Sequence, residues 1–308
     1  MVRLPRRIDE TNVTEFLASF DNVLSDCDGV LWKTGKVIGC ANDTINRLQS
    51  MGKKVLYVTN NSTLSREQYV DKCQKLGFQA KKEDIICSSY VLAQYLYHQQ
   101  FNKTVYVIGE DGIGAELDHV GIKHTGIGAD PAPTNEKILT VAETRELDAD
   151  VGAVAIGLDG QFSFPKMIMA TSYLLNSDIL FLATNPDEMV PVNREDMTCP
   201  GAGALVSAVE TASGRKATVV GKPSEILFSV IKRNHNLDPA RTLMIGDRCN
   251  TDILFGKCCG LQTLQVLSGV TSYQNLQQYA LGEKIEENNF LADYYLPELG
   301  GLLDLIDY

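Results

Sequence analysis

Four apolar segments, two toward each end of the chain, have the length and composition of short buried strands. Each is followed directly or almost directly by a polar residue, and these polar residues are Asp26, Thr59, Lys222 and Asp247. Helical patterns separate the segments, and this alternation of strand and helix predicts parallel strands in an α/β fold. Because ligands bind beyond the carboxyl ends of the strands of an open parallel sheet, we expect these four side chains to converge on one edge.

The stretch from residue 88 to residue 200 has apolar strands of its own and is interpreted as an inserted domain. These strands are expected at residues 105–108, 151–156 and 179–183. Residues 1–87 and 201–308 would then form one core domain, because a loop between two core strands can accept a whole domain when its ends are close in space. The segment 217–220, just before Lys222, is assigned to this core.

The composition is that of a globular protein, and the charge argues against nucleic-acid or membrane binding. Hydrophobic residues make up 44% and charged residues 22% of 308 residues, and the net charge is −11 at pH 7. This charge repels phosphate backbones and anionic lipids, and no basic patch is evident. No uncharged apolar run approaches the roughly 18 residues that cross a bilayer, and residues 1–10 lack a secretion signal. We therefore expect a soluble, cytoplasmic protein.

Asp26 and Asp28 are two carboxylates separated by one residue at the end of an apolar segment. A carboxylate can attack phosphorus to form an aspartyl-phosphate, while a second carboxyl group protonates the leaving alkoxide and later takes a proton from the attacking water. The pair Asp26 and Asp28 therefore offers both groups that such a reaction needs, a nucleophile and an acid and base. The structural alternative is an Asx turn that places Gly29 in a left-handed conformation.

Asp247 and Asp252 add two more acids after another apolar segment. Four acids at one edge would repel each other, and Mg²⁺ prefers such hard oxygen ligands together with water and substrate phosphate, so the acids predict a magnesium site. Either residue alone could instead cap a helix.

Lys222 can supply the positive charge that an anionic nucleophile needs when it meets a phosphate dianion. Thr59, together with the backbone of Asn60 and Asn61, can donate hydrogen bonds to the phosphoryl oxygens. Taken alone, Lys222 would more often be a solvated surface lysine.

The ordered motifs resemble those of the haloacid dehalogenase superfamily. The matching segments are Asp26–Trp32, Thr59–Ser62, Gly221–Ser224 and Gly246–Arg248 with Thr251–Ile253. The resemblance is closest to the branch that contains phosphoglycolate, pyridoxal phosphate and 4-nitrophenyl phosphatases. It implies a Rossmann-like three-layer core with a parallel sheet, and an inserted α/β cap of the C2 type that sets substrate specificity and forms a homodimer.

The resemblance also implies the roles of the individual residues. Asp26 would be the nucleophile and a Mg²⁺ ligand, and Asp28 the acid and base and a ligand through its backbone carbonyl. Asp247 would be a ligand and Asp252 would support the metal shell. The phosphate would be held by Thr59, Asn60, Asn61 and Lys222.

A phosphatase acting on a small phosphorylated metabolite is the function these motifs favour. Phosphoglycolate is the first expected substrate, with activity on 4-nitrophenyl phosphate, and pyridoxal phosphate is the second. Against pyridoxal phosphate stands the stretch Glu188–Pro191, which has no histidine where phosphatases of that substrate carry one in the cap. The alternatives are a protein phosphatase of the same family, a sugar phosphomutase, and an inactive binding protein that has kept the fold.

The eight cysteines show no paired C-x-x-C spacing, so most are expected to be buried, reduced thiols. Cys27 lies between the two catalytic candidates and has two interpretations. It is either a small packing residue or a redox switch whose oxidation would displace Asp26 and Asp28. The sequence leaves this choice open.

Overall fold

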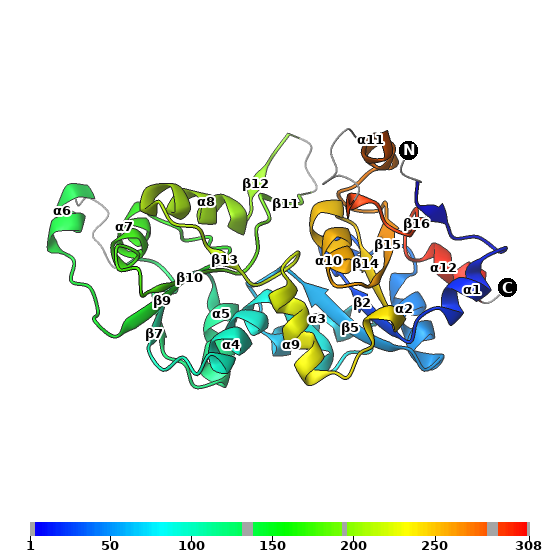
Figure 1. Cartoon of the computed structure of the whole chain (residues 1–308), viewed down its shortest axis with the longest axis horizontal. Coiled ribbons are helices and arrows are strands. Elements are labelled where there is room, and N and C mark those ends of the chain that lie inside the picture. The colour runs from blue at the N-terminus through cyan, green and yellow to red at the C-terminus, as the bar shows by residue number, and fades with distance from the viewer. Residues whose placement is uncertain (1–3, 131–137, 193–195, 282–288, 307–308) are drawn as a thin grey trace. The chain divides into compact units, whose positions relative to one another are not determined.

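The computed structural model describes residues 4–130, 138–192, 196–281 and 289–306 (Figure 1). These residues form two compact units, each with its own sheet. Of the described residues, those within 4–59, 69–86 and 222–306 form the first unit, and those within 60–68 and 87–221 form the second. No helix within the described ranges is long and apolar enough to cross a membrane.

The first unit is built on a seven-stranded sheet with the order β1-β16-β15-β14-β2-β5-β6. Its central strands are β2 (Asn22–Ser25), β5 (Lys54–Thr59), β14 (Thr242–Gly246) and β15 (Gln262–Val266). The outer strands are β1 (Arg6–Arg7), β16 (Tyr294–Leu296) and β6 (Ile85–Cys87). Strand β2 pairs in parallel with β5 and β14, and β15 pairs in parallel with β14 and β16, which confirms the α/β expectation.

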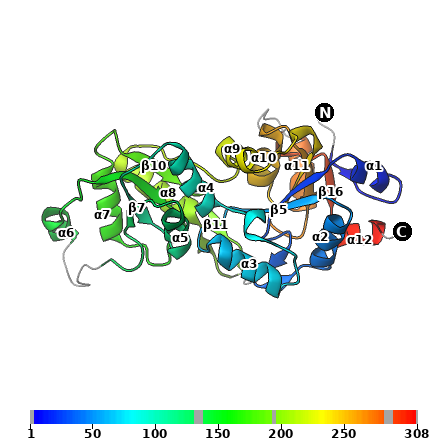
Figure 2. The ribbon, with the colours of Figure 1, turned by 90° about the horizontal axis from the view of Figure 1, so that it is seen from below.

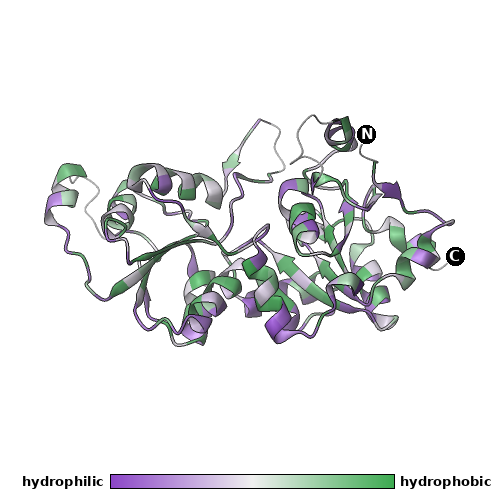
Figure 3. Ribbon diagram, in the orientation of Figure 1, coloured by the Kyte–Doolittle hydropathy of each residue, from purple (hydrophilic) through white to green (hydrophobic). Residues whose placement is uncertain are grey.

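Helices cover both faces of this sheet, as the right-handed rule for parallel crossovers requires. Figure 2 shows α2 (Ala41–Ser50), α3 (Arg66–Lys75) and α12 (Gly301–Ile306) on one side, with α9 (Glu225–Asn234), α10 (Leu254–Cys258) and α11 (Tyr273–Leu281) on the other. The short helix α1 (Val13–Ala18) precedes β2. Because the sheet is covered on both faces, β2 and β5 are buried beyond their first residues, and Figure 3 shows apolar residues in green among the strands of this unit.

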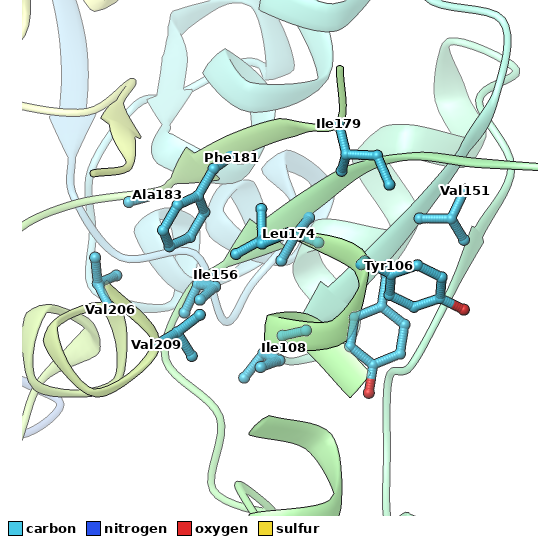
Figure 4. Close-up of a cluster of buried hydrophobic side chains, with 13 residues drawn as sticks. Tyr106, Ile108, Val151, Ile156, Leu174, Ile179, Phe181, Ala183, Val206 and Val209 are labelled. Atoms are coloured by element: carbon cyan, nitrogen blue, oxygen red, sulfur yellow. The ribbon is translucent and has the colours of Figure 1, made fainter. Parts of the chain in front are cut away.

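The second unit has a five-stranded sheet with the order β13-β10-β9-β7-β8. Its strands are β7 (Thr104–Ile108), β8 (His124–Thr125), β9 (Val151–Ile156), β10 (Leu180–Ala183) and β13 (Thr218–Val219). Its helices are α4 (Ser88–His98), α5 (Asp111–His119), α6 (Ile138–Thr144), α7 (Phe164–Tyr173) and α8 (Ala202–Ser213). One face of the sheet packs on α7 and α8 through the buried cluster of Figure 4, in which Ile156, Leu174 and Val209 contribute side chains.

The units differ from the expected domains at two places. Residues 201–221 belong to the second unit, because α8 packs on its sheet and β13 pairs in parallel with β10. The assignment of segment 217–220 to the core sheet was therefore wrong. Residues 60–68 also belong to the second unit rather than the first. A short apolar segment does not reveal which of two parallel sheets it will join.

Two small antiparallel ribbons complete the described fold. The first pairs β3 (Trp32–Lys33) with β4 (Lys36–Val37) directly after the Asp26 motif. The second pairs β11 (Met189–Val190) with β12 (Cys199–Pro200) in the second unit.

Candidate active site

Asp26 stands at the carboxyl end of β2, in the middle of the larger sheet. Its backbone N–H donates a hydrogen bond of 2.8 Å to the carbonyl oxygen of Ile245 in the neighbouring strand β14. The residue is 7% exposed. The sheet therefore fixes the backbone at this carboxylate, and the residue is almost wholly buried.

Lys222 links Asp26 to Asp252. Its Nζ lies 2.5 Å from Oδ1 of Asp26 and 2.8 Å from Oδ1 of Asp252, and it also donates a hydrogen bond of 3.0 Å to the carbonyl oxygen of Val58. Lys222 is 1% exposed, so the alternative of a solvated surface lysine is wrong. A buried ammonium with three oxygen partners is held in one position.

Asp26, Asp247 and Asp252 each place one carboxylate oxygen within 4.8 Å of the others, and all three residues are buried. Asp247 Oδ2 accepts a hydrogen bond of 2.8 Å from the N–H of Val270. Asp252 Oδ2 accepts one of 3.1 Å from the N–H of Arg248, at the start of the helical turn Cys249–Ile253, so Asp252 also caps that turn.

Two glycines, Gly29 and Gly269, lie directly against the Asp247 carboxylate. A Cβ atom on Gly29 would lie 2.5 Å from Asp247 Oδ2, and one on Gly269 would lie 1.8 Å from it. Gly29 also has φ of 95°, in the left-handed region that favours glycine, as the Asx-turn alternative expected. Both positions therefore exclude any side chain from the space around this carboxylate.

The buried charges change the proton affinity of the whole cluster. Burial raises the pKa of Asp26 well above its ordinary value, although Lys222 opposes the shift. Burial and the neighbouring Asp252 raise the pKa of Asp247 to about 7. Burial acts to lower the pKa of Lys222, but the charges of Asp252 and Asp26 outweigh it and raise that pKa. Burial is thus the main cause for the two carboxyl groups, whereas the neighbouring carboxylates decide the direction for Lys222.

This donor set fits a divalent cation. Three ionised carboxylates beside one ammonium leave two negative charges in excess in a buried place, and Mg²⁺ would neutralise them. The ligands are hard carboxylate oxygens of the kind that Mg²⁺ takes, and Gly29 and Gly269 let the Asp247 carboxylate approach the backbone closely. Asp26 and Asp247 are the expected ligands, and Asp252 is held by Lys222 and Arg248.

Asp28 points its carboxylate to a different set of partners. Oδ1 accepts a hydrogen bond of 2.8 Å from Nε1–H of Trp32 and lies 3.6 Å from Nζ of Lys72. The Asp28 side chain is 42% exposed, far more than that of Asp26. A group that exchanges protons with a substrate and with water needs this access.

The boundary between the two units falls within the predicted phosphate-binding segment. Thr59 belongs to the first unit, and Asn60 and Asn61 belong to the second. Thr59 ends β5, beside β2, and is 2% exposed. The Asn60 carbonyl oxygen accepts hydrogen bonds from Ser88 Oγ at 2.6 Å and Asn185 Nδ2 at 2.7 Å, both in the second unit. Asn61 Oδ1 accepts bonds from the N–H and Oγ1 of Thr63, each 2.8 Å. Their binding of phosphate stays a prediction.

The cysteines agree only in part with the sequence expectation. Four of the eight are buried, namely Cys27, Cys73, Cys87 and Cys249. Cys40 and Cys258 are exposed, so the view that most cysteines are buried was too broad. Cys27 is 0% exposed, and burial together with Asp26 raises the pKa of its thiol well above the ordinary value. These properties favour packing over a redox switch.

Sequence reasoning missed Trp32 and Lys72 as functional candidates. Trp32 lies four residues after Asp28 and forms a bridge with it across the turn, so the local signal was present. Lys72 lies on α3, and only the folded chain brings it to Asp28.

Comparison with known sequences assigns the chain to a family of hydrolases. Residues 23–123 match the haloacid dehalogenase-like hydrolase family, and residues 219–297 match a related HAD-hydrolase-like family. The two matches span more than half of the chain, and both carry acids of the site described above. The protein belongs to the haloacid dehalogenase-like hydrolases.

Individual relatives are similar over nearly the whole chain. A glycerol-3-phosphate phosphatase of Gallus gallus is 37% identical, over 98% of this chain and 97% of the relative. The chloroplastic phosphoglycolate phosphatase 1A of Arabidopsis thaliana is also 37% identical, over 95% of this chain and 79% of the relative.

Solved structures share the fold. A p-nitrophenyl phosphatase from Archaeoglobus fulgidus has a TM-score of 0.77 at 28% identity, covering 93% of this chain and 99% of that one. A glycerol phosphate phosphatase from Mycobacterium tuberculosis, solved with magnesium, has a TM-score of 0.73 at 26% identity, covering 93% of this chain and 77% of that one.

Proposed function

We propose that this protein is a magnesium-dependent phosphatase that hydrolyses the phosphate monoester of a small metabolite through an aspartyl-phosphate on Asp26. The observation that carries the proposal is the buried contact of Lys222 with Asp26 and Asp252, beside Asp247. This arrangement holds a carboxylate nucleophile in place and gathers the charge that receives a phosphate.

The reaction takes two steps on the same face of the site. An oxygen of Asp26 bonds to phosphorus while the ester P–O bond breaks, and Asp28 gives its proton to the departing alkoxide. Asp28, now a carboxylate, takes a proton from water as that water attacks phosphorus and releases Asp26. Asp28 is then protonated again, and the protein is ready for the next turnover.

The remaining residues reduce the repulsion between the Asp26 carboxylate and the phosphoryl oxygens. Lys222 faces the nucleophile, and Thr59, Asn60 and Asn61 are proposed to donate hydrogen bonds to the phosphoryl oxygens. Mg²⁺, held by Asp26 and Asp247 with the Asp28 carbonyl and with Asp252 in support, would withdraw charge from the phosphoryl group. Catalysis of this kind depends mainly on positioning.

The second unit is proposed to act as the cap that selects the substrate. Phosphoglycolate and glycerol 3-phosphate are the first substrates to test, because relatives that cover nearly the whole chain carry those names. Both compounds are small, anionic phosphate esters of an alcohol. We further propose a homodimer formed through the cap and a cytoplasmic location, the latter because Cys40 and Cys258 are exposed free thiols.

The test is a hydrolysis screen in which released phosphate is measured for phosphoglycolate, glycerol 3-phosphate, pyridoxal phosphate and 4-nitrophenyl phosphate. We expect one of the two alcohol phosphates to give the highest kcat/KM. Chelation should abolish the activity, and Mg²⁺ should restore it while Ca²⁺ should not, since Ca²⁺ prefers more ligands and looser geometry. Absence of phosphate release from every compound in the presence of Mg²⁺ would refute the proposal.

A further inference from the structure

Asp28 is held through one of its two carboxylate oxygens. Trp32 Nε1–H donates a 2.8 Å hydrogen bond to Oδ1, and Lys72 Nζ lies 3.6 Å from the same atom. Among the residues that the structure describes, the partners of this carboxylate both contact Oδ1. The two partners thus act on the same atom from two different elements, the turn after β2 and the helix α3.

Both partners are themselves fixed by packing. Trp32 is 0% exposed, and its ring meets the ring of Phe78 edge-to-face at a centroid distance of 5.5 Å. Lys72 Nζ lies 4.5 Å from the centroid of the Trp32 ring and 5.5 Å from that of Tyr69, at distances where a ring face attracts a cation. The indole therefore holds the ammonium as well as the carboxylate.

We propose that Trp32 and Lys72 are positioning residues that fix Oδ1 of Asp28 so that Oδ2 carries the proton moved in the reaction. This inference rests on the proposed function of Asp28 as acid and base. Oδ1 accepts an N–H bond and faces an ammonium, so a proton on that oxygen would point at two donors. Oδ2 is therefore the oxygen assigned to proton exchange, and the orientation of the carboxylate decides where a proton is delivered.

The proton balance of the two steps follows from this assignment. In the first step Oδ2–H gives its proton to the ester oxygen as the ester P–O bond breaks and the bond from Asp26 to phosphorus forms. In the second step Oδ2 takes a proton from water as the water oxygen bonds to phosphorus and the bond to Asp26 breaks. Trp32 and Lys72 gain and lose no proton, and they touch neither phosphorus nor the leaving group.

Lys72 is suited to a kinetic test because its removal should leave the fold intact. Its side chain is 26% exposed and its ion pair is 3.6 Å long, and an ion pair of this kind contributes little to stability. Lys72→Met keeps the length of the side chain and removes the charge, whereas Lys72→Arg keeps the charge. Lys75→Met, at an exposed position on the same helix, is the matched control.

The expected effect of Lys72→Met on the rate differs between an alkyl and a 4-nitrophenolate leaving group. For an alkyl phosphate such as glycerol 3-phosphate, Lys72→Met should lower kcat by about tenfold, a part of the 10² to 10⁴ that acid–base catalysis supplies, while KM stays within about twofold. The first release of 4-nitrophenolate, measured by stopped flow, should keep its rate because this stable leaving group needs no proton. Lys72→Arg should recover most of the loss, and Lys75→Met should match wild type.

Trp32→Phe tests the other contact, because it removes the N–H and keeps a ring beneath Lys72. It should show the same pattern as Lys72→Met, with kcat for the alkyl phosphate lowered and the first release of 4-nitrophenolate unchanged. In an Asp28→Asn background, Lys72→Met should cause no further loss, since Lys72 acts through Asp28.

Several outcomes would overturn the inference. A rise in KM with kcat unchanged would make Lys72 a substrate-binding residue, and equal losses for both leaving groups would remove the link to proton transfer. A further loss in the Asp28→Asn background would show that Lys72 acts on another group. If wild type itself forms no phosphoenzyme, the proposed function fails. If wild type forms it and Lys72→Met behaves like Lys75→Met, only this inference fails.

Discussion

Lys222 and Asp26 form a buried ion pair in which Nζ lies 2.5 Å from Oδ1, although 196 residues separate them in the chain. The ammonium also faces Asp252 at 2.8 Å, so its removal would leave two buried carboxylates without their cation. The pair therefore connects stability with catalysis. The Lys222 ammonium would cancel negative charge during attack on phosphate, and in the resting protein it compensates the charges of Asp26 and Asp252.

We expect Lys222→Met to lower the free energy of unfolding by about 3 to 5 kcal/mol, the usual cost of removing one partner of a buried pair. Urea titration with Mg²⁺ present is the measurement, and phosphate release should be lost as well. Lys232→Met, at an exposed position on α9, serves as the control. A change of less than about 1 kcal/mol would mean that the Lys222 pair contributes no more than a surface contact.

Asp26→Asn should leave a folded protein with no measurable phosphatase turnover, because an amide is a very poor nucleophile. The substitution keeps the shape of the side chain and removes one negative charge from a cluster that has an excess of them. The melting temperature without Mg²⁺ should therefore not fall. Phosphate release and a thermal melt measure the two effects, and substantial residual turnover would exclude Asp26 as the nucleophile.

Asp28→Asn should still form aspartyl-phosphate from 4-nitrophenyl phosphate and then turn over slowly. Loss of the acid matters least for a stable leaving group, whereas hydrolysis of the intermediate needs Asp28 as a base. Steady-state turnover should fall by roughly 10² to 10⁴, and labelled phosphate should accumulate on the protein in a rapid-quench experiment. Normal turnover without accumulation would assign the proton transfer to another residue.

Mg²⁺ should raise the melting temperature more at pH 8 than at pH 5.5. The pKa of Asp247 is raised to about 7 by burial and by Asp252, so the folded protein without a cation holds a proton there at pH values where the unfolded chain has lost it. This group therefore makes the metal-free protein less stable as the pH rises from about 4 to about 7, and the loss is complete above that range. Mg²⁺ must displace the proton at pH 5.5 but not at pH 8.

The measurement is a thermal melt at both pH values with about 1 mM Mg²⁺ and without it. Asp247→Asn removes the titrating group and a proposed ligand, so its melting temperature should respond weakly to Mg²⁺ at either pH. An equal response of wild type at pH 5.5 and pH 8 would contradict a protonated Asp247.

The sequence predicted the meeting of Asp26, Lys222 and Asp247 because residues that follow apolar segments gather at the carboxyl edge of a parallel sheet. It did not predict that β13, the strand before Lys222, pairs with β10 in the other sheet. Apolar content specifies burial, whereas the choice between two parallel sheets depends on packing partners far away in the chain. The same limit hid Lys72, whose contact with Asp28 depends on how α3 docks.

Asn60 gives a second example of that limit. The sequence predicts that its backbone donates to phosphate, which stays a prediction, and it did not predict that its carbonyl oxygen accepts hydrogen bonds from Ser88 and Asn185. These donors lie 28 and 125 residues away, so no local pattern could reveal them. The motif thus predicted a donor role for this residue, whereas the anchoring of its carbonyl oxygen became visible only in the folded chain.

Cys27 should resist oxidation in the folded protein, which reverses the redox alternative that the sequence had left open. Peroxide reacts with exposed thiolates, and Cys27 is 0% exposed with a thiol pKa raised by burial and by Asp26. After peroxide treatment, mass spectrometry should find oxidation at the exposed Cys40 and Cys258 and not at Cys27.

Cys27→Ser should stay active and lose activity to peroxide no more slowly than wild type, whereas Cys40→Ser and Cys258→Ser report any loss that the exposed thiols cause. A sulfenic acid on Cys27 that forms in step with inactivation and is reversed by dithiothreitol would restore the switch and imply that the buried turn after β2 opens to solvent.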